Sequence, residues 1–200
     1  MTDVELRDGS RVEIRALGPD DKAGLAAGFE RLSADSRYRR FLSPTPKLTT
    51  RQLAYLTDVD HHDHEALVAI EPTRRDGVGV ARYVRSQAIL DEAEFAVAVA
   101  DDWQRLGVGT ALLRQLATRA REEGVAWFTG LVLAHNESIL HLLAGLGQVE
   151  RRSAATGTIE VRLHVPDEPH GDEHEPRLAR WMHLAATGEL ESRLRHTSPG

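Results

Sequence analysis

Length and composition exclude membrane-spanning helices, because the 200-residue chain is 41% hydrophobic and 28% charged and has no stretch near the roughly 18 consecutive apolar residues required. It has no cysteine and a formal net charge of −6, so disulfides, thiolate metal sites and a general attraction to nucleic acid are not expected. The acidic first residues do not resemble a signal peptide, and we therefore expect a cytoplasmic protein that binds neither nucleic acid nor membrane.

The first third of the chain predicts a β-hairpin followed by helices. Asp8 and Gly9 lie between two short alternating segments, which is the signal of a hairpin turn. Apolar residues at helical spacing follow, with Ser33 placed to cap a second helix and Thr49 or Thr50 a third. The expected helices cover residues 19–32, 34–42 and 51–56.

The remainder of the globular part predicts an antiparallel meander and then alternating helices and strands. The expected strands cover residues 65–71, 77–85, 94–100, 126–133 and 158–165. One helix is expected over residues 107–123, with Gly124 as its left-handed terminal residue, and another over residues 137–145, capped by Asn136. This order predicts an α/β (α+β) domain over residues 1–165.

The chain changes composition after Pro166. Residues 166–176 are acidic and contain proline, which is typical of a linker. Residues 177–200 then carry apolar side chains at helical intervals, so we expect an extra C-terminal helix and tail. That helix is expected to pack on the domain or on a partner, with the protein a monomer or a homodimer.

One segment joins a strand to a helix through glycines. Residues 104–109 read Gln-Arg-Leu-Gly-Val-Gly, and a helix that begins here exposes backbone N–H groups that an anion can reach. Alone, this pattern indicates either a tight turn or a pyrophosphate site. A dinucleotide fold fits poorly, because the first glycine of its fingerprint is absent and the next strand ends in Ala134 and His135 rather than an acid.

The motif "VAVADDWQRLGVGTALL" resembles the acyl-CoA-binding motif of the GNAT superfamily of N-acetyltransferases, and "NESILHLLAGLG" is similar to its second cofactor motif. The resemblance covers residues 4–165 and implies a mixed, mostly antiparallel sheet flanked by helices. "LSADSRYRRFLSP", "LAYLTDVDHHDHEALVAI" and "GVARYVR" look most like bacterial Pat-type protein lysine acetyltransferase domains. The chain departs from that pattern at Gln148, where the family usually has an aromatic residue, and it leaves no room for a regulatory domain.

The resemblance implies acetyl-CoA as cosubstrate, no metal, and a general-base role for Glu94. The residues alone favour a solvated acid at a strand end for Glu94. The implied cofactor-binding residues are Val97, Ala98, Val99, Gln104, Arg105, Leu106, Gly107, Val108, Gly109, Thr110, Asn136 and Ser138. Relatives often have a tyrosine that acts as the general acid where this chain has Leu142 or Leu143. Solvent or His141 is therefore left to protonate the departing thiolate.

The acceptor stays open at this point. A protein lysine is implied by the resemblance, a small-molecule amine is the rival, and a non-catalytic acyl-CoA sensor or interaction module is the alternative from another class.

Two charged clusters are expected to have no catalytic role. "DVDHHDH" is interpreted as a solvated loop at the substrate entrance rather than a metal site. Arg37, Arg39 and Arg40 are interpreted as the solvated face of a helix, and the alternative is that they steer an acidic substrate or the cofactor's 3′-phosphate.

Overall fold

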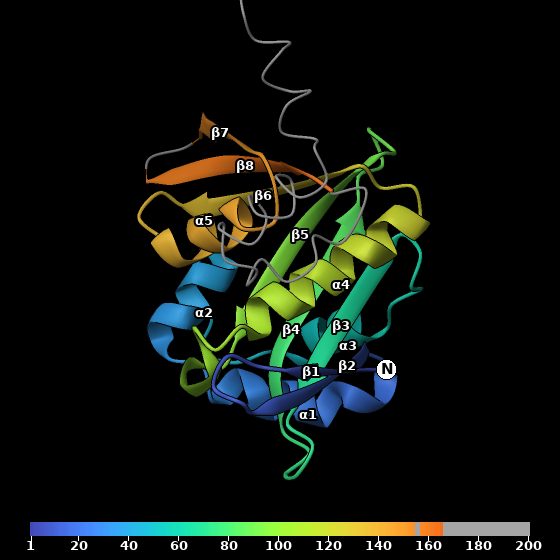
Figure 1. The fold of residues 1–200 in the computed structure, drawn as a ribbon, viewed down its shortest axis with the longest axis vertical. Coiled ribbons are helices and arrows are strands. Elements are labelled where there is room, and N and C mark those ends of the chain that lie inside the picture. The colour runs from blue at the N-terminus through green and yellow to red at the C-terminus, as the bar shows by residue number, and fades with distance from the viewer. Residues whose placement is uncertain (155–156, 166–200) are drawn as a thin grey trace, which may run out of the picture. The chain divides into compact units, whose positions relative to one another are not determined.

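The computed structural model describes residues 1–154 and 157–165, which form one mixed sheet flanked by helices (Figure 1). The predicted linker at 166–176 and the predicted helix and tail at 177–200 lie outside the described residues. The strands are β1 (Thr2–Glu5), β2 (Arg11–Ala16), β3 (His64–Ile70), β4 (Gly77–Arg85), β5 (Glu92–Val99), β6 (Trp127–Leu133), β7 (Val149–Ser153) and β8 (Thr158–His164). The helices are α1 (Lys22–Glu30), α2 (Ala34–Phe41), α3 (Thr50–Thr57), α4 (Val108–Glu122) and α5 (Glu137–Ala144).

The helix ends form where the sequence places capping residues. The Ser33 hydroxyl accepts a hydrogen bond from the Ser36 N–H at 3.2 Å and starts α2. Thr49 and Gln52 form a reciprocal capping box at the start of α3, which decides between the two threonines considered. Gly124, at φ +78°, follows the end of α4 as expected.

The described strands follow the order β1-β2-β3-β4-β5-β6-β8-β7 across the sheet. All neighbours are antiparallel except β5 and β6, which run parallel. The connection between these two strands is α4, which packs on β3, β4 and β5 (Figure 1). The single parallel pair lies inside the sheet. Parallel neighbours need a crossover connection, and α4 provides it here.

The sheet has a different core on each face. Under α4, the apolar side chains Leu112, Leu116 and Ala120 are fully buried against strand residues that include Leu67 and Tyr83. The alternate strand residues face the other way, where Leu17, Ala66, Val68 and Ile70 form a smaller cluster with Leu25 of α1. Strand alternation thus leaves the α1 face less completely filled than the α4 face.

Strand β7 was not expected from the sequence. Its five residues, Val-Glu-Arg-Arg-Ser, contain one apolar side chain and four exposed polar ones. It pairs only with β8, as the last strand of the sheet, so no buried face imposes an alternating pattern on it. The described residues contain no helix that is both long and apolar enough to cross a membrane.

Candidate acetyl-transfer site

The parallel pair β5 and β6 separates after three residue pairs. The paired residues are Glu92 with Trp127, Ala93 with Phe128 and Glu94 with Thr129. Beyond Glu94, β5 continues to Val99 hydrogen-bonded only to β4 on its other side. Within the described residues, one edge of the β5 backbone therefore has no partner strand along residues 95–99, and Glu94 lies where the two strands diverge.

The space between the diverging strands belongs to a cleft of ≈ 940 Å³. Its lining comes from both strands, from the turn into α4, from the start of α5 and from α2. The lining residues are 94–99, 101, 103–105, 107, 109, 110, 130–132, 136–139, 141 and 142, with Arg7, Leu32, Ser36 and residues 39–42. Segments distant in sequence thus meet at one point where a strand edge and a helix start both have free backbone groups.

The turn before α4 exposes the first N–H groups of the helix. Gly107 is its N-cap residue at φ +108°, a conformation that glycine adopts without strain, and no side chain caps the helix. Arg105 also has a positive φ, of 65°. The start of a 15-residue helix therefore faces the cleft with unpaired donors and the positive end of its dipole.

A hydrogen-bond network holds this turn against β5 and α2. The Gln104 side-chain amide donates to the Val99 carbonyl oxygen at 3.2 Å, to Ser36 Oγ at 3.2 Å and to Asp101 Oδ1 at 2.9 Å. Asp101 also accepts from the Ser33 N–H at 2.6 Å and from the Ser36 hydroxyl. Burial alone would raise the pKa of Asp101, but these hydrogen bonds outweigh it and lower the pKa. Gln104 thus fixes the shape of the turn.

The second cofactor motif packs directly on the first. A Cβ atom added at Gly109 would lie 2.8 Å from Leu142 Cδ1 of α5, so an alanine here would displace the end of the Leu142 side chain. Asn136 Oδ1 accepts from the Ile139 N–H at 3.4 Å and caps α5, and Asn136 also lines the cleft. The capping role and the cleft position considered for Asn136 therefore coexist.

Two glutamates on β5 have different surroundings. Glu92 is ion-paired with Arg162, whose Nη2 lies 2.7 Å from Glu92 Oε1. Glu94 is exposed, lines the cleft and makes none of the ion pairs recorded among the described residues. Its negative charge acts on Arg40, which also lines the cleft, and raises the pKa of that guanidinium against the larger, lowering effect of burial. Glu94 is thus the β5 carboxylate that a molecule in the cleft can reach.

The structure gathers most of the residues expected to bind the cofactor. Leu106 and Val108 are not among the residues that line the cleft; Val108 is fully buried in the α4 core and Leu106 packs against it. Exposed His141 and Ser138 both line the cleft on α5. Trp103 was missed because nothing in its local pattern distinguishes a cleft residue from a core residue.

The interpretation of the α2 arginines as a wet helix face is wrong for two of them. Arg37 donates to the carbonyl oxygens of Glu30 at 2.9 Å and Pro46 at 3.0 Å, which joins α2 to its neighbouring loops. Arg40 is partly buried and lines the cleft. Arg39 pairs with Asp35 at 2.7 Å, as a helix-surface arginine commonly does.

The loop at residues 58–64 does not line the cleft, so its expected place at the substrate entrance is wrong. His62 instead contacts Glu123 at the C-terminal end of α4, and His61 Nδ1 lies 2.7 Å from the buried Glu65. Asp60 accepts the backbone N–H groups of His64 and His62, and these bonds lower its pKa. No group of three potential metal ligands occurs within the part of the chain that the structure describes.

Comparison with known proteins identifies the family to which this site belongs. The model of the "Acetyltransferase (GNAT) family" matches residues 29–147, which include β5, the turn, α4 and α5. The chain belongs to the GNAT family. Its fold is accordingly the GNAT fold, and the cleft occupies the place where its two cofactor motifs meet.

GNAT relatives match most of this chain. Acetyltransferase Pat of Mycolicibacterium smegmatis is 32% identical over 163 residues, covering 82% of this chain and 48% of the relative. Acetyltransferase PA5475 of Pseudomonas aeruginosa is 33% identical over 159 residues, covering 76% and 83%. The GNAT domain of S. lividans PAT has a TM-score of 0.76 and 30% identity, covering 82% of this chain and 96% of that one. The chain thus spans about half the length of the M. smegmatis relative.

The turn has features suited to binding a diphosphate. The uncapped N–H groups at the start of α4 are donors for phosphate oxygens, and Gly107 presents no side chain between them and the cleft. The free edge of β5 offers peptide groups for an extended chain that lies beside it as an added strand. Arg7 and Arg105 place positive charge at the same end of the cleft.

Proposed function

We propose that this protein transfers the acetyl group of acetyl-CoA to a primary amine, with Glu94 as the general base. The observation that carries the proposal is the position of Glu94, an unpaired carboxylate at the point where β5 and β6 diverge. A bound acetyl-CoA supplies an activated acyl group as a thioester.

The chemical task of Glu94 is to take a proton from the acceptor. A lysine-type amine has a pKa of about 10.4, so forming the neutral amine at pH 7 costs about 4.6 kcal/mol. A carboxylate within reach, directly or through one water, accepts that proton as the amine nitrogen bonds to the carbonyl carbon. Because Glu94 has no ion-pair partner like Arg162 of Glu92, its oxygens are available for this role.

The backbone of β5 has the complementary task. Peptide groups of Val97 and Val99 on the free edge hold the pantetheine arm, and an N–H group directed at the thioester oxygen stabilises the negative charge that develops there. As the carbon–sulfur bond breaks, the thiolate takes a proton from solvent or from His141, the exposed histidine on the α5 wall of the cleft.

The acceptor indicated by the Pat-type resemblance is a protein lysine. A small-molecule amine is the rival, because α2 and the neighbouring loops that form the acceptor side belong to the most variable parts of such folds. Initial rates on a panel of lysine-containing peptides, compared with polyamines and aminoglycosides at equal concentration, distinguish the two. Saturable turnover of the small amines alone would exclude the protein acceptor.

The first prediction concerns Glu94→Gln. Replacing the base with an isosteric amide is expected to lower kcat by about a hundredfold or more at neutral pH, with acetyl-CoA affinity retained. Steady-state thiol release and acetyl-CoA titration measure the two quantities.

Glu92→Gln is the matched control, since it removes one carboxylate two residues away on the same strand. Loss of the Arg162 ion pair is expected to reduce stability while kcat stays close to that of the wild type. Full activity of Glu94→Gln, or equal loss in both variants, would disprove the assignment of the base.

A second candidate function is an acyl-CoA-binding module without turnover. Leu142 and Leu143 favour it, because Leu143 is fully buried, Leu142 packs on Gly109, and neither can donate a proton. This candidate predicts stabilisation by acetyl-CoA and background thiol release with every amine tested. Measurable release with any acceptor rules it out.

A further inference from the structure

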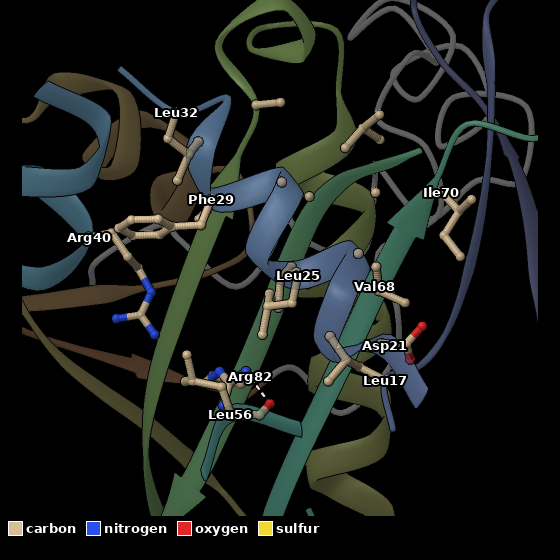
Figure 2. A pocket seen from close by; sticks show the side chains of 18 of the residues that line it. Leu17, Asp21, Leu25, Phe29, Leu32, Arg40, Leu56, Val68, Ile70 and Arg82 are labelled. Atoms are coloured by element: carbon tan, nitrogen blue, oxygen red, sulfur yellow. Dashed lines mark hydrogen bonds between the residues drawn. The ribbon is translucent and has the colours of Figure 1, made fainter. Parts of the chain in front are cut away.

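A second cavity lies beneath α1, on the sheet face opposite α4. We call it the α1 cavity; it has a volume of ≈ 140 Å³ and is bounded by α1, α2, α3 and the alternate residues of β3, β4 and β5 (Figure 2). Most of its wall is apolar and includes Leu25, Phe29, Leu56 and Val68. A cavity of this size has room for a short aliphatic chain with a small head group.

Four arginines line this mainly apolar space, and two of them are already neutralised. Arg15 Nη2 lies 2.7 Å from Asp21 Oδ1, and Arg75 Nη1 lies 2.8 Å from Glu13 Oε2. The first pair joins β2 to the segment before α1, and the second joins the turn between β3 and β4 to β2. Their charges therefore need no further partner.

The other two arginines, Arg40 and Arg82, have no carboxylate within ion-pair distance in the part of the chain that the structure describes. Arg82 is 5% exposed and donates to two neutral groups, the Leu56 carbonyl oxygen at 2.8 Å and His64 Nε2 at 3.1 Å. Arg40 lies over the Phe41 ring, 4.9 Å from its centroid. Both arginines line the α1 cavity, and Figure 2 shows the Arg40 guanidinium beside Phe29 and the Arg82 side chain next to Leu56.

Burial and mutual repulsion make these two charges costly. Burial, with the nearby positive charge of Arg40 acting in the same direction, lowers the pKa of Arg82 to about 10. Burial also lowers the pKa of Arg40. Two like charges that lie close together and are partly removed from water destabilise the fold, and an anion placed between them would lower that cost.

The α1 cavity and the catalytic cleft share part of their walls. Leu32, Arg40, Phe41, Ala96 and Ala98 line both. Ala96 and Ala98 alternate with Glu94 on β5 and carry only methyl groups, so small side chains separate the base from the cavity. Arg40 is also the cation on which the charge of Glu94 acts. A molecule with its amine at Glu94 therefore lies within reach of Arg40.

We propose that Arg40 and Arg82 form an anion site for the acceptor, so that the preferred amine carries a carboxylate on a short apolar chain. The inference rests on the proposed function. The amine lies at Glu94, the apolar chain passes Ala96 and Ala98, and the carboxylate accepts hydrogen bonds from the Arg40 guanidinium in the α1 cavity. The carboxylate belongs either to a small amino acid or to an acidic residue of a peptide, and both present the same group.

The activity test compares matched acceptors that differ in one carboxylate. Lysine is paired with lysinamide, and a lysine peptide flanked by glutamate with the same peptide flanked by glutamine. The wild type is expected to favour the carboxylate of at least one pair by about tenfold in kcat/KM, the range of a charged hydrogen bond. The pair that shows the preference identifies the source, and equal rates within both pairs overturn the proposal.

The variants test the residues. Arg40→Gln is expected to abolish the preference, measured as the ratio of kcat/KM values within each pair, whatever its effect on the absolute rates. Arg75→Gln is the control, because Arg75 lines the same cavity but already pairs with Glu13; it is expected to keep the preference. Arg40→Lys retains the positive charge but lacks the planar, bidentate guanidinium, so an intermediate preference is expected. This variant replaces Arg40→Gln in the test if Arg40→Gln does not fold.

A binding test distinguishes failure of this inference from failure of the proposed function. Hexanoate, which has no amine, is expected to raise the melting temperature of the wild type and of Arg75→Gln in the absence of acetyl-CoA, while hexanamide does not. The shift is expected to disappear in Arg40→Gln. A chain that lacks turnover but shows this pattern retains the anion site; an equal shift with hexanamide, or a shift that survives Arg40→Gln, overturns the site whatever the activity.

Discussion

Single residues in this protein differ in role because of the partner that each one meets. Glu92 and Glu94 share a strand and a face, yet among the described residues Glu92 forms an ion pair with an arginine and Glu94 does not. The sequence could identify Glu94 only through its resemblance to a family motif, because the ion pair of Glu92 involves Arg162, 70 residues away in the chain. Likewise, the pattern of α2 could not show that Arg40 lines the cleft, since three arginines in four positions look like a solvated face.

His64 is expected to make stability depend on pH near neutrality. Burial lowers its pKa from 6.5, with the charge of Arg82 acting in the same direction against Asp60 and Glu65, and its Nε2 accepts a hydrogen bond from Arg82. The unfolded state then binds more protons just below pH 6.5, so stability falls as the pH falls through that value. In His64→Gln this contribution is absent while the amide oxygen can still accept from Arg82.

Urea unfolding of both proteins at several values between about pH 7.5 and pH 5 measures this contribution. The free energy of unfolding of the wild type is expected to drop more steeply than that of His64→Gln. Parallel curves would show that His64 titrates alike in the folded and unfolded states.

At the scale of elements, the site depends on how α4 and α5 cross. Gly109 in the first turn of α4 is in contact with Leu142 of α5, and both residues line the cleft. The same glycine thus serves helix packing and access to the first N–H groups of α4. The sequence predicted both helices and their order, but it could not show this contact, because the two residues lie on separate elements.

Gly109→Ala is expected to weaken both the fold and acetyl-CoA binding. The new methyl group would lie 2.8 Å from Leu142 Cδ1, so α5 must shift or Leu142 must change rotamer, at a cost of about 1–3 kcal/mol. Chemical denaturation and acetyl-CoA titration measure the two effects.

The double variant Gly109→Ala with Leu142→Ala separates the effect on stability from the effect on acetyl-CoA binding. Removal of the Leu142 side chain is expected to restore part of the stability and to leave the cofactor affinity reduced, since the added methyl group still faces the cleft. Gly24→Ala is the control, because nothing lies within 4 Å of its added Cβ atom. A Gly109→Ala protein with wild-type stability would contradict the close packing described.

Across the described part of the molecule, the other features of the site are arranged around the point where β5 and β6 diverge. Capping residues, glycines and strand alternation predicted most elements, because those signals are local, whereas the mixed sheet was implied by the family resemblance. The short strand β7 and the α1 cavity were not predictable in this way. Strand β7 depends on pairing with β8 alone, and the α1 cavity depends on how completely α1, α2 and α3 fill one face of the sheet.

Acetyl-CoA is expected to stabilise the whole fold. Because its proposed site includes β5, the turn before α4 and the start of α5, binding requires the folded arrangement of all three. At a ligand concentration a hundredfold above Kd, the expected gain is about 2.7 kcal/mol, seen as a rise in melting temperature.

Glu94→Gln is expected to show the same rise, since its change affects proton transfer rather than the diphosphate cradle. Acetate at the same concentration is the control and is expected to give no comparable shift. A melting temperature that does not respond to acetyl-CoA in the wild type would contradict the proposed cofactor site.

Ala96 and Ala98 line both the catalytic cleft and the α1 cavity, and each contributes only a methyl group. Acceptor choice can therefore change through the volume of two side chains on β5, while the peptide groups of that strand remain in place to hold the acyl donor. Selectivity for the amine and binding of the thioester can therefore evolve separately, although β5 contributes to both.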